Sequence, residues 1–131
     1  GDQLTGLQRA ADAVFVDPAL IDYAVKLTNA TRELTAVGLD ELTPFITFGA
    51  SPRASINMIL AGRALALVRG REYALPEDVR EIAPDVLRHR LVLSYRALAD
   101  GVTADDVIER ILGLVPAPEL ALRERVVRGG A

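Results

Sequence analysis

The residue that most suggests chemistry is an arginine in the stretch "GASPRAS", residues 49–55. Ser51 is predicted to be the N-cap of a helix, with Pro52 as the first helical residue and Arg53 as the second. A helix N-terminus carries partial positive charge, so a cation there is unfavourable unless an anion compensates it. The stretch therefore predicts that Arg53 meets an anionic ligand, with a weak surface salt bridge to a carboxylate as the alternative.

Other arrangements that could support catalysis are poorly represented. The chain has no cysteine and a single histidine, His89, which argues against a thiolate metal site, a zinc cluster or a Ser-His-Asp triad. The segment "AVGLDEL" at 36–42 has the apolar-then-acidic order of magnesium-binding strands in nucleotide hydrolases. Such a strand works with a glycine-rich phosphate loop, and the only lysine, Lys26, follows no loop of that kind. We predict that the chain on its own is not an enzyme and holds no metal.

A basic patch is expected around "RHR", residues 88–90, together with Arg96. Acidic residues close by in the sequence can neutralise it: Glu77, Asp78, Glu81 and Asp85. A salt-bridged face is one interpretation, and a helix-turn-helix that binds nucleic acid is another. The 15-residue gap from 88 to 102 disfavours the second, because that turn has about three or four residues. A contact of Arg88 or Arg90 with a neighbouring subunit is left open.

The composition favours a single soluble domain. The 131 residues carry a net charge of -3, half of them are apolar, and no apolar run approaches the roughly 20 residues of a membrane span. The slightly acidic balance provides no general attraction for nucleic acid. The lack of cysteine and of a signal-peptide pattern favours the cytoplasm, and a first residue other than methionine suggests a fragment.

Apolar spacing and capping residues predict five amphipathic helices. They cover residues 4–15, 18 to about 33, 52 to about 69, 76 to about 87, and 104–115. Asp17 should cap the second helix and Thr103 the last one. Gly70 should stop the third helix, and Pro84 should kink or end the fourth.

Three further segments are predicted to be outside these helices. Residues 35–50 should form an extended connection, and 90–96 a short strand whose expected partner is 72–75. Residues 119–131 should form a tail. The expected fold class is therefore all-α, a small helical bundle over residues 1–118 with room for one short two-stranded ribbon.

Several motifs, taken in order, resemble one known family. "GASPRAS" before an alanine-rich helix, then "ALVRGREYALPEDVREIAPDVLRHRL" and "VTADDVIERILGLVPAP", are similar to the C-terminal lid domain of MoxR-family AAA+ ATPases. "VFVDPALIDYAVKLTNATRE" looks like the first two lid helices, so the likeness covers roughly residues 4–118. Leu75 departs from a strong pattern, because threonine or serine would cap "PEDV" better. The resemblance implies a helical AAA+ lid that follows a nucleotide-binding core on the same polypeptide.

The resemblance also implies a role for the arginine. Arg53 would be the sensor-2 residue, which contacts the γ-phosphate of ATP in the core, and Gly49, Ser51 and Pro52 would shape its turn. ATP and Mg would be bound mainly by the core, whose motifs these residues lack. Implied partners are that core, neighbouring subunits of a ring expected to be hexameric, and von Willebrand factor A domain proteins, in chaperone-like remodelling or maturation of other complexes. The alternative function is a helical protein-interaction adaptor without nucleotide contact.

Overall fold

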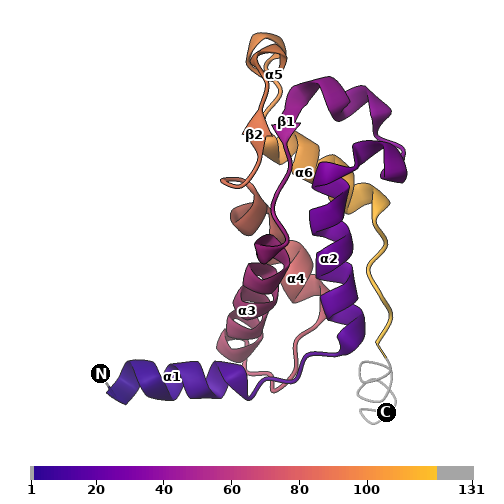
Figure 1. Ribbon diagram of the computed structural model, residues 1–131. Helices are drawn as coiled ribbons and strands as arrows, with labels where there is room; N and C mark the ends of the chain where they lie inside the picture. The colour runs from indigo at the N-terminus through magenta and orange to yellow at the C-terminus, as the bar shows by residue number, and fades with distance from the viewer. Residues whose placement is uncertain (1, 121–131) are drawn as a thin grey trace.

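Six α-helices and a short antiparallel ribbon make up most of residues 2–120, the part of the chain that the structure, a computed structural model, describes (Figure 1). The α-helices are α1 (Asp2–Asp12), α2 (Pro18–Arg32), α3 (Arg53–Val68), α4 (Pro76–Leu87), α5 (Tyr95–Asp100) and α6 (Ala104–Leu114). The other elements are the 3-10 helices η1 (Leu34–Val37) and η2 (Asp40–Phe45) and the strands β1 (Ile46–Phe48) and β2 (Val92–Leu93). The predicted all-α bundle with one two-stranded ribbon is confirmed.

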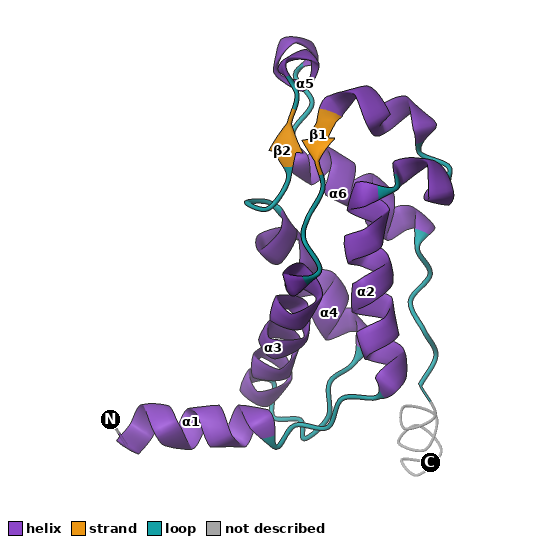
Figure 2. Ribbon diagram, in the orientation of Figure 1, coloured by secondary structure: helices purple, strands orange, loops and turns teal. Residues whose placement is uncertain are grey.

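The core lies where α2, α3, α4 and α6 stand together, whereas α1 extends away from the body of the molecule (Figure 2). Each of these four helices contributes fully buried side chains: Leu20, Tyr23 and Leu27 from α2, Met58 from α3, Val79 and Leu87 from α4, and Ile108 and Ile111 from α6. The predicted apolar stripes therefore face one another. Burial of such side chains, at about 25 cal/mol per Å² of apolar surface, is the main favourable contribution to folding.

Two of the predicted helix caps are confirmed. Asp17 Oδ1 accepts a hydrogen bond from the Ala19 amide at 2.9 Å, and Pro18 follows as the first residue of α2. Thr103 and Asp106 form a reciprocal capping box at α6, in which the Asp106 amide donates to Thr103 Oγ1 at 3.1 Å and the Thr103 amide donates to Asp106 Oδ2 at 2.9 Å. Both helices thus begin where the sequence predicts.

The start of α4 depends on a residue inside the helix. Leu75 precedes the helix, and its side chain has no oxygen to accept a hydrogen bond, as the sequence suggests. Asp78 compensates in part, because its Oδ2 accepts the Leu75 amide at 2.7 Å. The end of the preceding α3 is as predicted, since Gly70 follows it with φ of 75°, a conformation that glycine adopts readily.

Pro84 does not end α4. The helix continues to Leu87, and the Arg88 amide donates to the Pro84 carbonyl at 2.9 Å. Ala83 and Leu87 are fully buried on the core side of this segment. Their burial offsets the hydrogen bond that proline cannot donate.

The segment between α2 and α3 is more regular than the predicted extended connection. Residues 34–45 are mostly in η1 and η2, and only Ile46–Phe48 is a strand. These short turns bury Leu34, Leu39 and Leu42 against the core. The prediction of an extended segment is wrong because 3-10 turns of a few residues leave no long apolar period in the sequence.

The second predicted strand exists, but its predicted partner is wrong. β2 pairs antiparallel with β1, with Ile46 opposite Leu93 and Phe48 opposite Val92. The pair includes an irregularity between Ile46 and Phe48. Residues 72–75 lie elsewhere, because an alternating pattern identifies an extended segment without showing which other segment it joins.

The segment 72–75 contacts the linker between α1 and α2. The Phe15 amide donates to the Glu72 carbonyl at 2.8 Å, and the Ala74 amide donates to the Phe15 carbonyl at 2.9 Å. This parallel bridge pairs Phe15 with Tyr73. It joins the segment before α2 to the segment before α4.

The predicted tail lies largely outside the described residues. Leu120 is 2% exposed and belongs to the core cluster. Residues 121–131 are not among those described. The structure therefore describes only the first two residues of the segment 119–131 that the sequence assigns to a tail.

Candidate functional site: an unpaired arginine at the start of a helix

Arg53 is the first residue of α3, and its side chain is exposed. Within residues 2–120 this side chain has no hydrogen-bond or ion-pair partner. The surface salt bridge that was the alternative explanation for this arginine is not formed there. Arg53 is therefore available to an anion from outside the described part of the chain.

The predicted Ser51 cap is wrong. Pro52 is the residue before the helix, with φ and ψ of -55° and -23°, and no side chain caps α3. The chain instead closes with backbone turns, in which the Ala54 amide donates to the Ser51 carbonyl at 3.0 Å and the Ser55 amide donates to the Pro52 carbonyl at 3.1 Å. Because these amides are already used, an anion at this point would depend mainly on the guanidinium of Arg53.

Gly49 allows the chain to pass very close to the end of α2. A Cβ at position 49 would lie 2.5 Å from the Thr31 carbonyl oxygen and 2.7 Å from Arg32 Cγ. The first contact is with backbone, so it cannot be relieved by moving a flexible side chain. Gly49 thus shapes the arginine turn by permitting this close approach.

Buried hydroxyl groups fasten the same turn to α2. Thr31 Oγ1 accepts a hydrogen bond from the Ala50 amide at 2.9 Å and donates one to the Thr28 carbonyl at 2.6 Å. The Ser55 hydroxyl lies 2.9 Å from the Pro52 carbonyl oxygen and 3.3 Å from Thr28 Oγ1. Since that hydroxyl has one proton, it donates to one of these oxygens at a time. We call Thr28, Thr31 and Ser55 the hydroxyl clamp.

An apolar groove of about 370 Å³ runs between α2 and α3 beside this turn. Its aliphatic lining comes from Ile21, Val25, Ile56, Ile59 and Leu60. Ile56 and Leu60 are 60% and 50% exposed. Pro52 and Ser55, close to Arg53 in the chain, also line the groove. An exposed apolar groove beside an unpaired cation is typical of a surface that contacts another domain.

Two buried polar atoms lack a hydrogen bond within the described residues, Arg63 Nε and the Tyr23 hydroxyl oxygen. Arg63 lines the α2–α3 groove, and no acidic residue is part of that lining. Burial raises the pKa of Tyr23, and the charge of Arg80 acts in the opposite direction. The Nε–H of Arg63 is thus a buried donor that no group in the described part of the chain uses.

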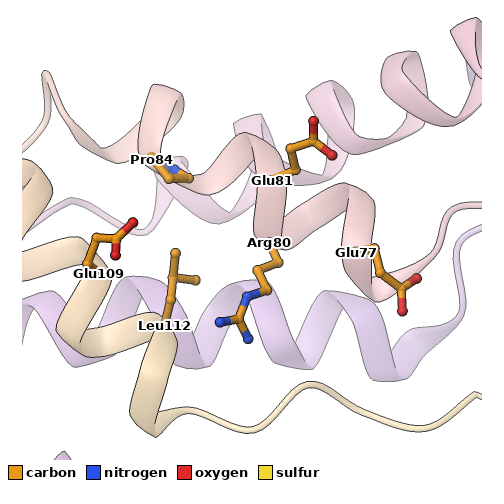
Figure 3. A pocket seen from close by; sticks show the side chains of 6 residues that line it. All are labelled: Glu77, Arg80, Glu81, Pro84, Glu109 and Leu112. Atoms are coloured by element: carbon orange, nitrogen blue, oxygen red, sulfur yellow. The ribbon is translucent and has the colours of Figure 1, made fainter.

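A second cleft, of about 410 Å³, is formed by α4 and α6 and has mixed charge (Figure 3). Figure 3 shows Arg80 and Glu81 pointing to opposite sides of α4, with Glu109 on α6. Glu77 also lines this cleft, and Glu81 is held by Arg69 at 2.5 Å. The nearby carboxylates oppose the binding of a phosphate at Arg80. This cleft was not predicted from the sequence.

The basic patch is partly neutralised, as the salt-bridged interpretation predicts, but two of the acids named for it, Asp78 and Glu81, pair with Arg69 and Arg71 instead. Arg88 pairs with Asp85 at 3.1 Å, and with Asp105 at 2.7 Å, an acid that sequence proximity did not suggest. Arg96 lies 3.7 Å from Asp100. Arg90 is exposed and has no ion pair within residues 2–120. Of the two arginines left open for a subunit contact, only Arg90 is therefore without an internal acid.

The predicted residues Gly49, Ser51, Pro52 and Arg53 are nearly consecutive and lie in the turn that leads into α3, whereas the hydroxyl clamp was not predicted. The sequence signal was weak, because Thr31 and Thr28 lie 19 and 27 positions from the residues that they contact, Ala50 and Ser55. Within the described part of the chain, no group of three or more His, Cys, Asp or Glu side chains could hold a metal ion. No helix in that part is long and apolar enough to cross a bilayer.

Comparison with known proteins defines the class. A family model described as the AAA lid domain matches residues 42–111, which extend from η2 into α6 and include the arginine turn. The match covers more than half of the chain, and the chain belongs to the AAA lid domain family. The helical bundle and the short ribbon described above form the greater part of the matched segment.

Within this family the chain is a lid of the MoxR type, as the resemblance implied. It is 51% identical over 120 residues to "Chaperone MoxR1" of Mycobacterium tuberculosis, which covers 92% of this chain and 32% of that protein. It is 31% identical over 114 residues to "Protein MoxR" of Methylorubrum extorquens, covering 81% of this chain and 32% of that one. The crystal structure of a provisionally described ATPase from Cytophaga hutchinsonii is similar, with a TM-score of 0.82 and 37% identity. The match covers 85% of this chain and 34% of that one.

The chain spans about a third of the length of the relatives it matches. The larger part of each relative therefore has no counterpart in these 131 residues. The similarity therefore shows what kind of domain this is.

Proposed function

We propose that this domain is the sensor-2 lid of a MoxR-type AAA+ ATPase, and that Arg53 contacts the γ-phosphate of ATP bound in a nucleotide-binding core. The observation that carries the proposal is the unpaired, exposed guanidinium of Arg53 at the start of α3. A guanidinium has several donors in a fixed fork, and this arrangement suits the oxygens of a phosphate. Membership of the lid family supports a nucleotide-bearing partner for this surface.

In this proposal Arg53 has two effects. It stabilises the negative charge on the γ-phosphate as that group is transferred to water. It also ties the lid to the core while the γ-phosphate is present, so that hydrolysis removes the tie and lets the lid shift. ATP and Mg would be held mainly by the core, and Gly49, Ser51 and Pro52 would contribute by shaping the turn that carries Arg53.

The groove between α2 and α3 supports the core of the same polypeptide as the partner. A domain that brings a phosphate within reach of the Arg53 side chain must also approach Pro52 and Ser55, which line the groove. Its apolar surface would then cover the exposed Ile56 and Leu60. For the longer protein we also propose, from the resemblance to the family, a ring expected to be hexameric, von Willebrand factor A domain partners, chaperone-like remodelling and a cytoplasmic location.

The test is steady-state ATP turnover by the longer protein that contains this lid, comparing wild type with Arg53→Ala. We expect a loss of about tenfold or more, equivalent to about 1.4 kcal/mol of transition-state stabilisation. Arg53→Lys should restore only part of it, because the ammonium keeps the charge without the fork. Arg96→Ala, which removes an exposed arginine on α5, is the matched control and should leave turnover unchanged.

The alternative is a helical adaptor that binds a protein partner without contacting nucleotide. The exposed groove favours this function as much as it favours a lid, because either would cover apolar side chains. Unchanged turnover in Arg53→Ala, with helix content preserved, would remove the phosphate contact and leave the adaptor as the better explanation.

A further inference from the structure

We propose that Thr31, supported by Thr28 and Ser55, is a positioning residue for Arg53. The inference rests on the proposed function, because it concerns how the arginine is aimed at a phosphate. Arg53 is the first residue of α3, and no side chain caps this helix. Capping therefore does little to fix the direction in which the preceding segment enters α3. The neighbouring helix α2 provides that constraint through the hydroxyl clamp.

The clamp acts on the backbone just before the arginine. Ala50 is fully buried, and its amide has Thr31 Oγ1 as acceptor at 2.9 Å. At the adjacent position, Gly49 lies so close to α2 that a Cβ would be 2.5 Å from the Thr31 carbonyl oxygen. The same residue of α2 therefore holds the turn by a hydrogen bond and by direct contact. A small shift at Thr31 would move the chain that leads to Arg53.

The hydroxyl group is the part of Thr31 that this role requires. It accepts from the Ala50 amide and donates to the Thr28 carbonyl, and Thr31 is 1% exposed. Water cannot readily replace either bond at such a site, so the bonds keep the turn in one place. Valine has nearly the same shape and neither capability, whereas serine keeps both.

The clamp also connects Arg53 to the groove. Ser55 lines the groove, and its hydroxyl lies within hydrogen-bond distance of the Pro52 carbonyl and of Thr28 Oγ1. A partner seated in the groove would therefore touch a member of the clamp two positions from Arg53. A partner that docks in the groove would therefore also affect the position of Arg53, through Ser55.

The first experiment measures the clamp itself, by hydrogen exchange of the Ala50 amide in this chain using NMR. We expect Thr31→Val to accelerate exchange at Ala50 and Thr31→Ser to retain most of the protection. Ile111→Val, a buried change in α6, is a control for general loss of stability and should not affect Ala50 selectively. Equal exchange at Ala50 in wild type and Thr31→Val would overturn the clamp.

The second experiment measures kcat and KM for ATP in the longer protein that contains this lid. A misplaced arginine should lower kcat in Thr31→Val by about tenfold with little change in KM, since a small misplacement of a catalytic group is costly to the rate. Thr31→Ser should restore kcat to near wild type, and Ile111→Val should leave it unchanged. Helix content and the midpoint of urea unfolding are compared for each variant, so that a loss caused by unfolding is recognised.

The outcomes separate this inference from the proposed function. If Arg53→Ala lowers kcat but Thr31→Val does not, the arginine contacts phosphate and the positioning role is wrong. If Thr31→Val and Ile111→Val lower kcat equally, Thr31 contributes only stability and the positioning role is also wrong. If Arg53→Ala has no effect, the proposed function fails first, and the positioning role fails with it.

Discussion

Arg71 holds Asp78 by two nitrogen atoms, with Nη1 2.6 Å from Oδ2 and Nη2 2.5 Å from Oδ1, and the carboxylate is fully buried. Arg69 adds a contact at 3.1 Å, and the Leu75 amide another at 2.7 Å. The ion pair joins the loop after α3 to the first turn of α4. It therefore fixes how the helix that carries Arg53 connects to the next one.

Asp78→Asn should destabilise the domain by about 3 kcal/mol, because it removes the charge of a buried carboxylate and leaves Arg71, whose side chain is only 20% exposed, without its counter-charge. Urea unfolding followed by circular dichroism gives the free energy of unfolding. Asp85→Asn is the matched control, since Asp85 forms an exposed pair with Arg88 and such pairs contribute about 1 kcal/mol or less. Equal losses in the two variants would contradict the dominant role of the buried pair.

The stability of the domain should fall in acid partly through the same carboxyl group. Burial alone would raise the pKa of Asp78, but hydrogen bonds from Arg71 and Leu75 and the charges of both arginines hold its pKa below the ordinary value of about 3.9. The unfolded chain therefore takes up the proton at higher pH than the folded one. The contribution is complete above about pH 4 and is lost as the pH falls through the lowered folded pKa.

The pH dependence of stability can be assigned to Asp78 by comparing the wild type with a variant that lacks this carboxyl group. The free energy of unfolding of the wild type should decrease as the pH falls below about 4, and that of Asp78→Asn should decrease less. Other acids with lowered pKa, such as Asp106, are present in both proteins and cancel in the comparison. Parallel curves for the two proteins would rule out Asp78 as a source of the acid sensitivity.

Gly49→Ala should destabilise the domain by about 1–3 kcal/mol, because the added methyl group would overlap the Thr31 carbonyl and push the arginine turn away from α2. Thermal or urea unfolding measures the loss. Gly113→Ala is a well-matched control, since Gly113 lies within α6 and a Cβ there meets nothing within 4 Å. That change should be neutral or should stabilise by about 0.5–1 kcal/mol, the difference between alanine and glycine in a helix.

Leu60→Arg should impair ATP turnover by the longer protein if the groove between α2 and α3 receives the core. We expect a loss of about tenfold, because a cation placed among Ile21, Val25 and Ile56 would weaken docking of an apolar surface by about 1.4 kcal/mol or more. Val68→Arg, on the same helix at an 83% exposed position outside the groove lining, should have little effect. Sedimentation velocity distinguishes a different occupant, since a change in oligomeric mass with Leu60→Arg would indicate a second subunit in the groove.

Much of the fold could be predicted because the long helices carry complete local signals. Asp17, Gly70 and Thr103 mark helix ends by their own chemistry, and the stripes of α2, α3 and α6 repeat often enough to be recognised. The elements that escaped prediction are short. α5 is a helix of six residues, too few for an apolar period to be evident, although Ser94 does cap it through the Ala97 amide.

The site could be predicted only to the level of its arginine. Residue types indicate a cation at a helix start, and the resemblance implies its role. The hydroxyl clamp forms because the segment at Ala50 passes over the end of α2. Thr31 lies 19 positions before Ala50 in the sequence, so no local pattern shows this contact. The pairing of β1 with β2 escaped for the same reason, since contacts between distant segments depend on the whole packing.

The bridge between Phe15 and Tyr73 has a mechanical consequence. Because the Phe15 amide and carbonyl are both bonded to the segment before α4, α1 is attached to the bundle through the chain that leads to α2 and through these hydrogen bonds, and it also packs against α3. A pull on α1 would thus be shared among α2, α3 and α4 and could not act on α2 alone. We expect a displacement of α1 to reach all three helices through these contacts.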